Sequence, residues 1–236
     1  LVENPLLDDF GNYQYIWSVA DDRSISIPQA THRILGISYQ NSHFLGQVEA
    51  FYNNTTGLTQ LLQYGADSSL VVSKGCSRSY GVDMHLQWRI KKQQFWLAYT
   101  WSKTEELFDY SSNFQPAPQD QRHELKAVSL LNFRPFFASA SYVFGSGFPN
   151  ANSLFSPDSQ RFYSRLDLSL QYQKHFKNFG LELGLSVLNV MNTKNVQFNN
   201  FANFPDKKQA FRAATPFSPM LNIRVFFGPS SSAWLQ

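Results

Sequence analysis

Side chains that could carry out catalysis occur throughout this sequence, but their spacing matches no catalytic or metal-binding arrangement. No Gly-x-Ser-x-Gly segment is present that could hold a nucleophilic serine, which disfavours a hydrolase. The single cysteine, Cys76, has no partner for an internal disulfide and is predicted to be an inert thiol. The histidines show no spacing of metal ligands: they are His32, His43, His85, His123 and His175. We therefore predict that the chain is not an enzyme and uses no metal or cofactor.

Cationic and aromatic side chains near the ends of the expected strands are the candidates for ligand binding. Arginine forks suit carboxylates and phosphates, so the expected ligand is an anion. The candidates are Arg78, Tyr80, Arg122, His123, Arg161, Tyr163 and Arg212.

A second set of charged residues alternates with apolar neighbours. Side chains two positions apart on a strand share a face, so these charges are expected on one face of a sheet, pointing into a lumen. They could line a substrate path or contact another domain. The alternative, which we favour for any single residue, is a ladder of paired charges that stabilises the wall. The set comprises Glu49, Asp83, His85, Arg89, Glu124, Lys126, Arg165, Asp167, Glu182 and Arg224.

The elements that position these residues are strands, because apolar and polar side chains alternate with a period of two. In the segment 179–187, Phe179, Leu181 and Leu183 fall on one face, while Gly180 and Glu182 fall on the other. Similar alternation recurs along the chain, and no segment of comparable length shows the helical period. The sequence therefore predicts an all-β fold.

Nine antiparallel strands are predicted, and the connections between them alternate in length. The strands are expected at 31–40, 43–54, 77–91, 93–104, 121–133, 135–147, 161–175, 179–191 and 217–228. Tight hairpins are expected near residues 40–42, 92, 134–135 and 177–178, and long loops at 55–76, 105–120, 148–160 and 192–216. Outer-membrane barrels have this alternation, with short periplasmic turns and long extracellular loops.

The composition fits the same class. Aromatic residues reach 16% and charged residues only 16%, below the soluble average of roughly 25%. The mean hydropathy is negative and no run approaches the ~20 apolar residues of a membrane-spanning helix, as expected for a barrel with one polar face. Aromatic clusters at 88–101 and 133–137 are expected to form girdles at the membrane interfaces. No basic run is present, so nucleic acid is not an expected partner.

The same rule on turns predicts the orientation of the chain. Residues 1–30 are expected in an extracellular loop, residues 31–228 in the barrel wall, and residues 229–236 in a periplasmic tail. Nine strands do not close a free-standing barrel, and an open sheet in lipid would leave backbone groups unpaired. The chain is therefore expected to be a fragment, or to be completed by more polypeptide.

Several segments, in this order, resemble the carboxy-terminal barrel of TonB-dependent receptors, especially those of the Bacteroidetes type. A strand start at 77–87, an up-strand at 95–103 and an Asp-x-Arg-His opening at 120–123 are similar to family motifs. An aromatic-Gly-x-Gly-x-Pro exit lies at 144–149, and further matches lie at 32–39, 48–52, 165–169 and 188–192. The resemblance implies a sector of a 22-stranded barrel in the bacterial outer membrane.

The resemblance also implies a function and a set of partners. The parent protein would take up a scarce ligand such as a ferric siderophore, by energised transport, with glycan or peptide import as close alternatives. Its partners would be outer-membrane lipid, the remaining barrel and plug of the parent chain, and an inner-membrane TonB-type protein that acts on the plug. Because Arg122 and His123 belong to a family motif, a structural role is favoured for them over ligand binding.

Two other functions stay open. The barrel could be a structural subunit of a larger outer-membrane assembly, with a surface lipoprotein or other subunits as partners, or a diffusion porin. Exposed aromatics in the loop 192–216 could contact a substrate or a partner protein, or could pack on neighbouring loops. They are Phe198, Phe201, Phe204 and Phe211.

Overall fold

The computed structural model describes residues 5–7, 13–15, 20–21, 25–64, 69–117, 119–147, 162–197 and 212–227. In this part of the chain the secondary structure is entirely β, and no helix is long and apolar enough to cross a membrane. The expected extracellular segment 1–30 is described only in part, and the expected loop 148–160 and tail 229–236 lie outside the described residues.

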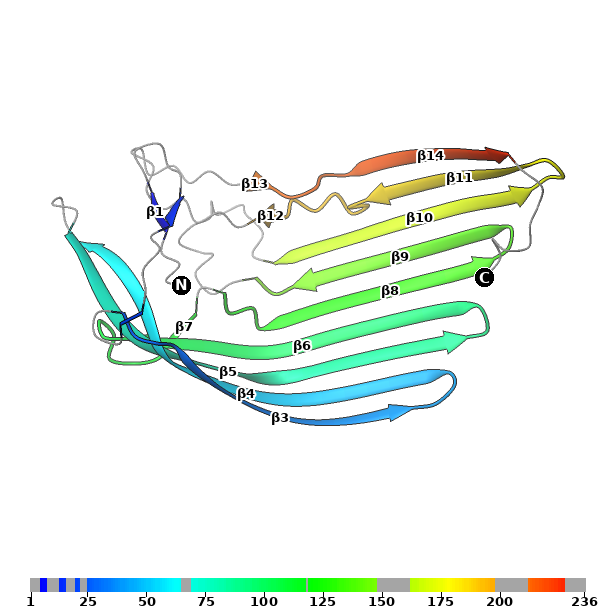
Figure 1. Cartoon of the computed structure of the whole chain (residues 1–236). Helices are drawn as coiled ribbons and strands as arrows, with labels where there is room; N and C mark the ends of the chain where they lie inside the picture. The colour runs from blue at the N-terminus through cyan, green and yellow to red at the C-terminus, as the bar shows by residue number, and fades with distance from the viewer. Residues whose placement is uncertain are drawn as a thin grey trace.

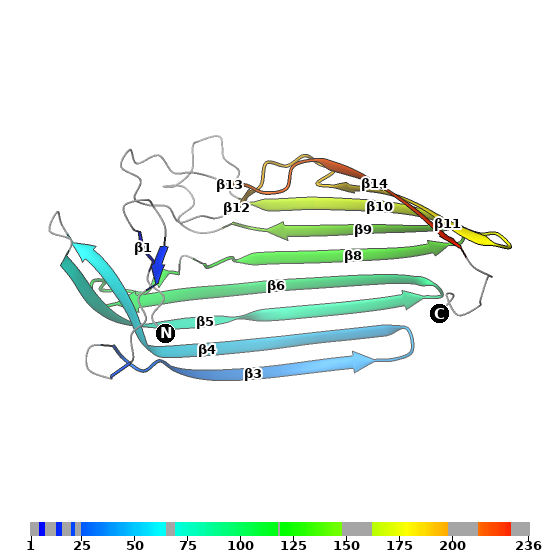
Figure 2. The same ribbon diagram turned by 45° about the horizontal axis from the view of Figure 1, so that its top comes forward.

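One large antiparallel sheet contains all nine predicted strands. They are β3 (Gln29–Gln40), β4 (Phe44–Tyr64), β5 (Ser69–Ile90), β6 (Gln93–Phe108), β8 (His123–Phe133), β9 (Phe136–Gly145), β10 (Tyr163–His175), β11 (Phe179–Leu188) and β14 (Ser218–Phe227). The order in the sheet is β14-β11-β10-β9-β8-β6-β5-β4-β3, so each strand pairs with its neighbours in sequence. Figures 1 and 2 show a single curved layer in which the strands run side by side.

Five short strands accompany the large sheet. β7 (Gln115–Pro116) pairs with the end of β6, at Glu105 and Glu106. β1 (Pro5–Leu7) pairs with β2 (Tyr13–Tyr15), and β12 (Val196–Gln197) pairs with β13 (Arg212–Ala213). The last pair falls within the predicted loop 192–216, whose phenylalanines lie outside the described residues.

The four tight turns are confirmed, and they all lie on the same side of the sheet, at one end of the strands. Only residues 41–43, 91–92, 134–135 and 176–178 separate the strands they join. In Figure 1 these turns all lie at the right, and the ends of the strands that lead into the longer connections all lie at the left.

The prediction that residues 55–76 form a loop is wrong. β4 continues to Tyr64 and β5 begins at Ser69, and the two strands stay paired as far as Tyr64↔Ser69. The polar run at 53–57 has the composition of a turn, but it forms a β-bulge between Thr56 and Leu58. Gly57 adopts a φ of 74° there, and a Cβ at this position would lie 2.6 Å from the carbonyl oxygen of Ile27. Glycine is therefore required for the hairpin to continue past the chain that enters β3.

The start of the predicted loop 105–120 is also strand. β6 extends four residues past the predicted end at 104, to Phe108, and Gly75 on β5 pairs with this last residue. The described remainder of the connection folds back through β7 onto β6.

The sheet has no conventional hydrophobic core. Among the described residues Ala117 is the only buried apolar residue. Large apolar side chains are instead exposed along the strands, including Leu168, Leu185, Ile223 and Phe227, the last at 85%. A single-layer sheet with this much exposed apolar surface needs a non-aqueous environment or a covering partner.

The paired residues are staggered across the sheet. A row of directly opposed residues begins at Phe44, the first residue of β4, and reaches β11 at Val187, one residue before that strand ends, and then β14 at Pro219. Between them the row passes through Trp88, Phe95, Ser129, Ala140 and Leu168. The row thus begins at the strand ends that carry the short turns and approaches the strand ends that lead into the long connections. Strands tilted in this way are a geometric requirement of barrels.

Candidate functional site

The register places all ten predicted lumen-facing residues on one face of the sheet, called here the polar face. The directly opposed residues Glu49, Asp83, Thr100 and Glu124 form a row on this face. The row continues through Gly145 to Tyr163, which starts the column of Tyr163, Arg165 and Asp167 on β10. That the face lines a lumen stays a prediction.

The polar face contains paired charges in some places and opposed like charges in another. Arg224 on β14 lies 3.3 Å from Glu182 on β11, a single cross-strand pair of the kind expected in a ladder of paired charges. Arg165 and Asp167 pair along β10 at 2.8 Å, and Lys126 pairs with Glu124 along β8. Glu49 and Asp83, in contrast, are direct neighbours across β4 and β5. Their described partners are neutral: Gln47 donates to Glu49 at 2.7 Å, and Thr100 donates to Asp83 at 2.6 Å.

The opposite face, called here the apolar face, holds the exposed apolar side chains of the strands. On β5 it presents Val82, Met84, Leu86 and Trp88. On β6 it presents Phe95, Leu97, Tyr99 and Trp101, which lie opposite those residues. Trp96, which the sequence analysis grouped with these aromatics, alternates onto the polar face, because adjacent residues on a strand point to opposite sides.

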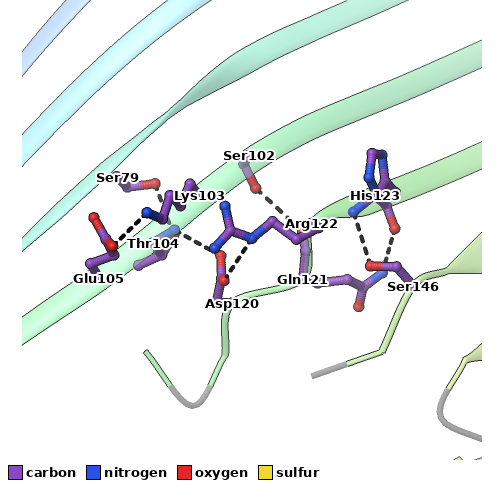
Figure 3. A network of polar contacts seen from close by, with 10 residues as sticks. All are labelled: Ser79, Ser102, Lys103, Thr104, Glu105, Asp120, Gln121, Arg122, His123 and Ser146. Atoms are coloured by element: carbon purple, nitrogen blue, oxygen red, sulfur yellow. Dashed lines mark hydrogen bonds and ion pairs between the residues drawn. The ribbon is translucent and has the colours of Figure 1, made fainter. Parts of the chain in front are cut away.

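Asp120 joins the end of β6 to the start of β8 (Figure 3). Its carboxylate, in a residue only 3% exposed, accepts a hydrogen bond from the backbone N–H of Thr104 at 2.7 Å. The other oxygen lies 3.1 Å from Nε of Arg122. Arg122 is therefore engaged in an internal ion pair that fixes the chain as it enters β8.

His123 is also tied into this junction. Its backbone N–H donates to Oγ of Ser146 at 3.0 Å, and its carbonyl accepts from the N–H of Ser146 at 2.9 Å. Its ring contacts the hydroxyl of Tyr99 at 2.8 Å. Figure 3 shows His123 and Ser146 linked in this way at the start of β8. This geometry agrees with the structural role favoured for Arg122 and His123.

A further ion cluster lies on the apolar face, past Trp101 on β6. Glu105, 6% exposed, accepts from Arg78 at 2.8 Å and from Lys103 at 2.6 Å. The Lys103 ammonium, helped by Arg78, holds the pKa of the Glu105 carboxyl below its ordinary value, against the opposing effect of burial. The guanidinium carbon of Arg78 also lies 4.0 Å from the centroid of the Phe114 ring.

A second buried polar cluster lies at the start of β10 and just past the end of β11. Asn189 is fully buried with a φ of 51°, and its side-chain amide donates to the carbonyls of Thr193 and Thr215, each at 3.0 Å. Asn195 pairs with the backbone of Ser164 through both ends of its amide, at 2.9 and 2.8 Å. These contacts attach the start and end of the 189–217 connection to the sheet.

The structure does not gather the predicted ligand-binding residues into one site. Arg78 and Tyr80 lie on the apolar face of β5, whereas Tyr163 lies on the polar face of β10. Arg161 and the side chain of Arg212 lie outside the described residues. Asp120, Asn189 and Asn195 were missed as organising residues, although the first two lie in motifs that the sequence analysis quotes. These three residues are distinguished by being polar and buried near the end of a strand. Burial cannot be read from the sequence, so no sequence signal identifies them.

The described residues contain no group of three or more His, Cys, Asp or Glu side chains that could hold a metal ion. Cys76 is a free thiol and is partly exposed.

Taken together, a staggered antiparallel sheet with one polar and one exposed apolar face defines the wall of a membrane β-barrel. The comparison with protein families matches residues 32–190 to the TonB-dependent receptor-like β-barrel. The chain belongs to this family, whose members are outer-membrane receptors and transporters rather than enzymes. The comparison with curated proteins gives no match.

Proposed function

We propose that this chain forms the carboxy-terminal wall of a 22-stranded receptor, of the Bacteroidetes type, that imports a scarce ligand such as a ferric siderophore by energised transport. The observation that supports the proposal best is the division of the sheet. Nine charged residues and His85 share the face opposite to the exposed apolar side chains. That arrangement suits a wall between lipid and an aqueous path.

In this proposal the ligand meets the polar face near the strand ends that lead into the long connections. It contacts the column of Tyr163, Arg165 and Asp167 there. Tyr163 lies opposite Gly145, and the side-chain amide of Gln121 lies over that glycine. Arg165 offers a guanidinium, although Asp167 occupies part of it at 2.8 Å. The remaining N–H groups of the Arg165 guanidinium would donate to an anionic chelate that approaches this column. The remaining barrel, a plug and a TonB-type protein would complete the transporter.

Energised uptake in the source bacterium tests this function. Deleting the coding region should abolish accumulation of a radiolabelled ferric siderophore under iron limitation, and a protonophore should have the same effect on the parent strain. A labelled oligosaccharide and a labelled peptide, assayed in parallel, test the two alternative substrate classes.

A structural subunit of an outer-membrane assembly is the second candidate. The opposed carboxylates Glu49 and Asp83 are compatible with it, because like charges directly opposite one another are destabilising unless a cationic group approaches them, and a partner subunit could supply that group as well as a plug. If deletion leaves uptake of all three labelled ligands unchanged but releases other proteins from the outer membrane, the subunit function replaces the receptor function.

A further inference from the structure

A row of four residues on the apolar face marks the point where that face changes from apolar to charged. Arg33, Tyr52, Tyr80 and Lys103 lie directly opposite one another on β3, β4, β5 and β6. These strands lie side by side in Figures 1 and 2. The next row toward the short turns is entirely apolar: it consists of Leu35, Ala50, Val82 and Trp101.

The depth of the apolar surface below this row matches the interior of a membrane. The apolar side chains of this face run along β5 from Val82 to Ile90, about 27 Å of strand. At a strand tilt of roughly 35–45° this spans about 20 Å along the membrane normal, compared with an apolar band about 25 Å tall in outer-membrane barrels. Aromatic rings lie at both limits of the band, with Trp88 opposite Phe95 at one and Tyr52 opposite Tyr80 at the other. The row is oblique to the strand ends, because Arg33 lies seven residues from the turn end of β3 and Lys103 lies ten residues from that of β6. The four residues therefore span the headgroup region on the side of the long connections instead of lying at a single depth.

The charge of this surface is positive. The row supplies Arg33 and Lys103, and Arg78 lies one row farther on, opposite Glu105. Glu105 is the one acidic residue on this face within the described parts of β3 to β6, and it is largely buried beneath Arg78 and Lys103. Three cations and one carboxylate leave this surface with a net charge of +2.

The cations and the tyrosines remain accessible to a ligand from outside the sheet. The side chains of Arg78 and Lys103 are 38% and 29% exposed, and Tyr52 is 39% exposed. The guanidinium of Arg33 lies 5.9 Å from the centroid of the Tyr52 ring, and no described carboxylate pairs with it. Guanidinium, ammonium and phenol groups are all donors that suit phosphate oxygens.

We propose that Arg33, Tyr52, Arg78, Tyr80 and Lys103 bind the phosphate groups of an anionic membrane lipid. The site rests on the proposed function, because it requires the apolar face to meet lipid. The occupant is a lipid headgroup rather than free phosphate, since the rows next to the site offer an apolar surface for acyl chains. Arg78 and Tyr80 would accordingly bind the membrane and not the transported ligand.

Titration of the purified full-length protein with lipid A, which carries phosphate groups on an acylated sugar, tests the site. The variant R33Q/K103Q removes two charges but keeps the ion pair of Arg78 with Glu105, so the buried carboxylate stays compensated. Each cation near a membrane surface favours anionic lipid, so the variant should bind lipid A about tenfold more weakly or worse. The variant R89Q/K126Q removes the same charge from the polar face and should bind like the unchanged protein.

Equal affinity of R33Q/K103Q and the unchanged protein for lipid A would overturn the site, as would an equal loss in R89Q/K126Q. Inorganic phosphate serves as the second probe: if it displaces lipid A at millimolar concentration, the site recognises phosphate alone and the lipid assignment is wrong. Reconstitution into phosphatidylcholine vesicles separates this failure from failure of the proposed function. A protein that inserts there but ignores lipid A has the wall without the headgroup site, and one that never inserts lacks both.

Discussion

At the scale of single residues, buried polar side chains at strand ends hold the connections against the sheet, whereas most exposed cations in the described part of the chain make no such contact. Asp120 joins the backbone of Thr104 to the side chain of Arg122, and Asn189 joins Thr193 to Thr215. Each satisfies backbone groups that the end of a ladder leaves unpaired, which is the general requirement for a buried strand end.

Replacing Asp120 with alanine should therefore lower the free energy of unfolding by about 1–3 kcal/mol, because the N–H of Thr104 loses its acceptor in a buried setting. The matched control is Asp109→Ala. Asp109 accepts the N–H of Lys74 at 3.1 Å in an exposed position, so its loss should change stability by about 0.5 kcal/mol or less. Urea unfolding of the detergent-solubilised protein, followed by gel mobility, measures both. Similar losses in the two variants would show that burial of Asp120 is not what matters.

At the scale of elements, close approach of neighbouring strands explains which glycines are required. A Cβ on Gly81 would lie 2.3 Å from the carbonyl oxygen of Trp101 on β6, so the backbones would have to separate. A Cβ on Gly184 would meet only Asn222, at 3.6 Å. Gly81→Ala should therefore cost about 1–3 kcal/mol, as overpacking typically does, and Gly184→Ala should be close to neutral. The same urea unfolding distinguishes them, and a neutral Gly81→Ala would mean that β5 and β6 adjust freely.

The two faces of β11 give a direct test of the alternation. Leu183 lies on the apolar face, 37% exposed, and Gly184 lies on the polar face. In a Cys76→Ser background, G184C should react with a membrane-impermeant charged thiol reagent in intact outer membranes, and L183C should not. Quantitative labelling of each variant by mass spectrometry provides the measurement. Reaction at position 183 but not at 184 would reverse the assignment of the faces.

At the scale of the whole molecule, the described sheet ends in two edges, at β3 and β14, which do not pair with each other. Unpaired backbone groups in lipid cost several kcal/mol each, so a membrane wall cannot leave such edges open. In the native outer-membrane protein, amides of β3 and β14 should exchange hydrogen as slowly as those of β8, which has a partner on both sides. Hydrogen exchange with mass spectrometry can compare the three strands. Rapid exchange at either edge would argue against a closed wall.

The parts of the fold that repeat locally could be predicted from sequence. Alternation in segments such as Phe179–Leu188 is a property of neighbouring residues, so the strands and the four tight turns follow from it. The polar face was predicted for the same reason. The loop predicted at 55–76 was wrong, because a bulge at Gly57 and a turn have the same local composition.

The sequence by itself thus determined the class of the fold, the strands and the alternation of their faces, since each depends on a period of two along the chain. Tertiary structure decided which residues meet across the strands that long connections join. Only the packing of the β6–β8 connection pairs Trp101 with His123 and buries Asp120 against Arg122. A tight turn fixes the register of the two strands that it joins, such as β5 and β6, whereas register across a long connection depends on contacts between segments far apart in the sequence.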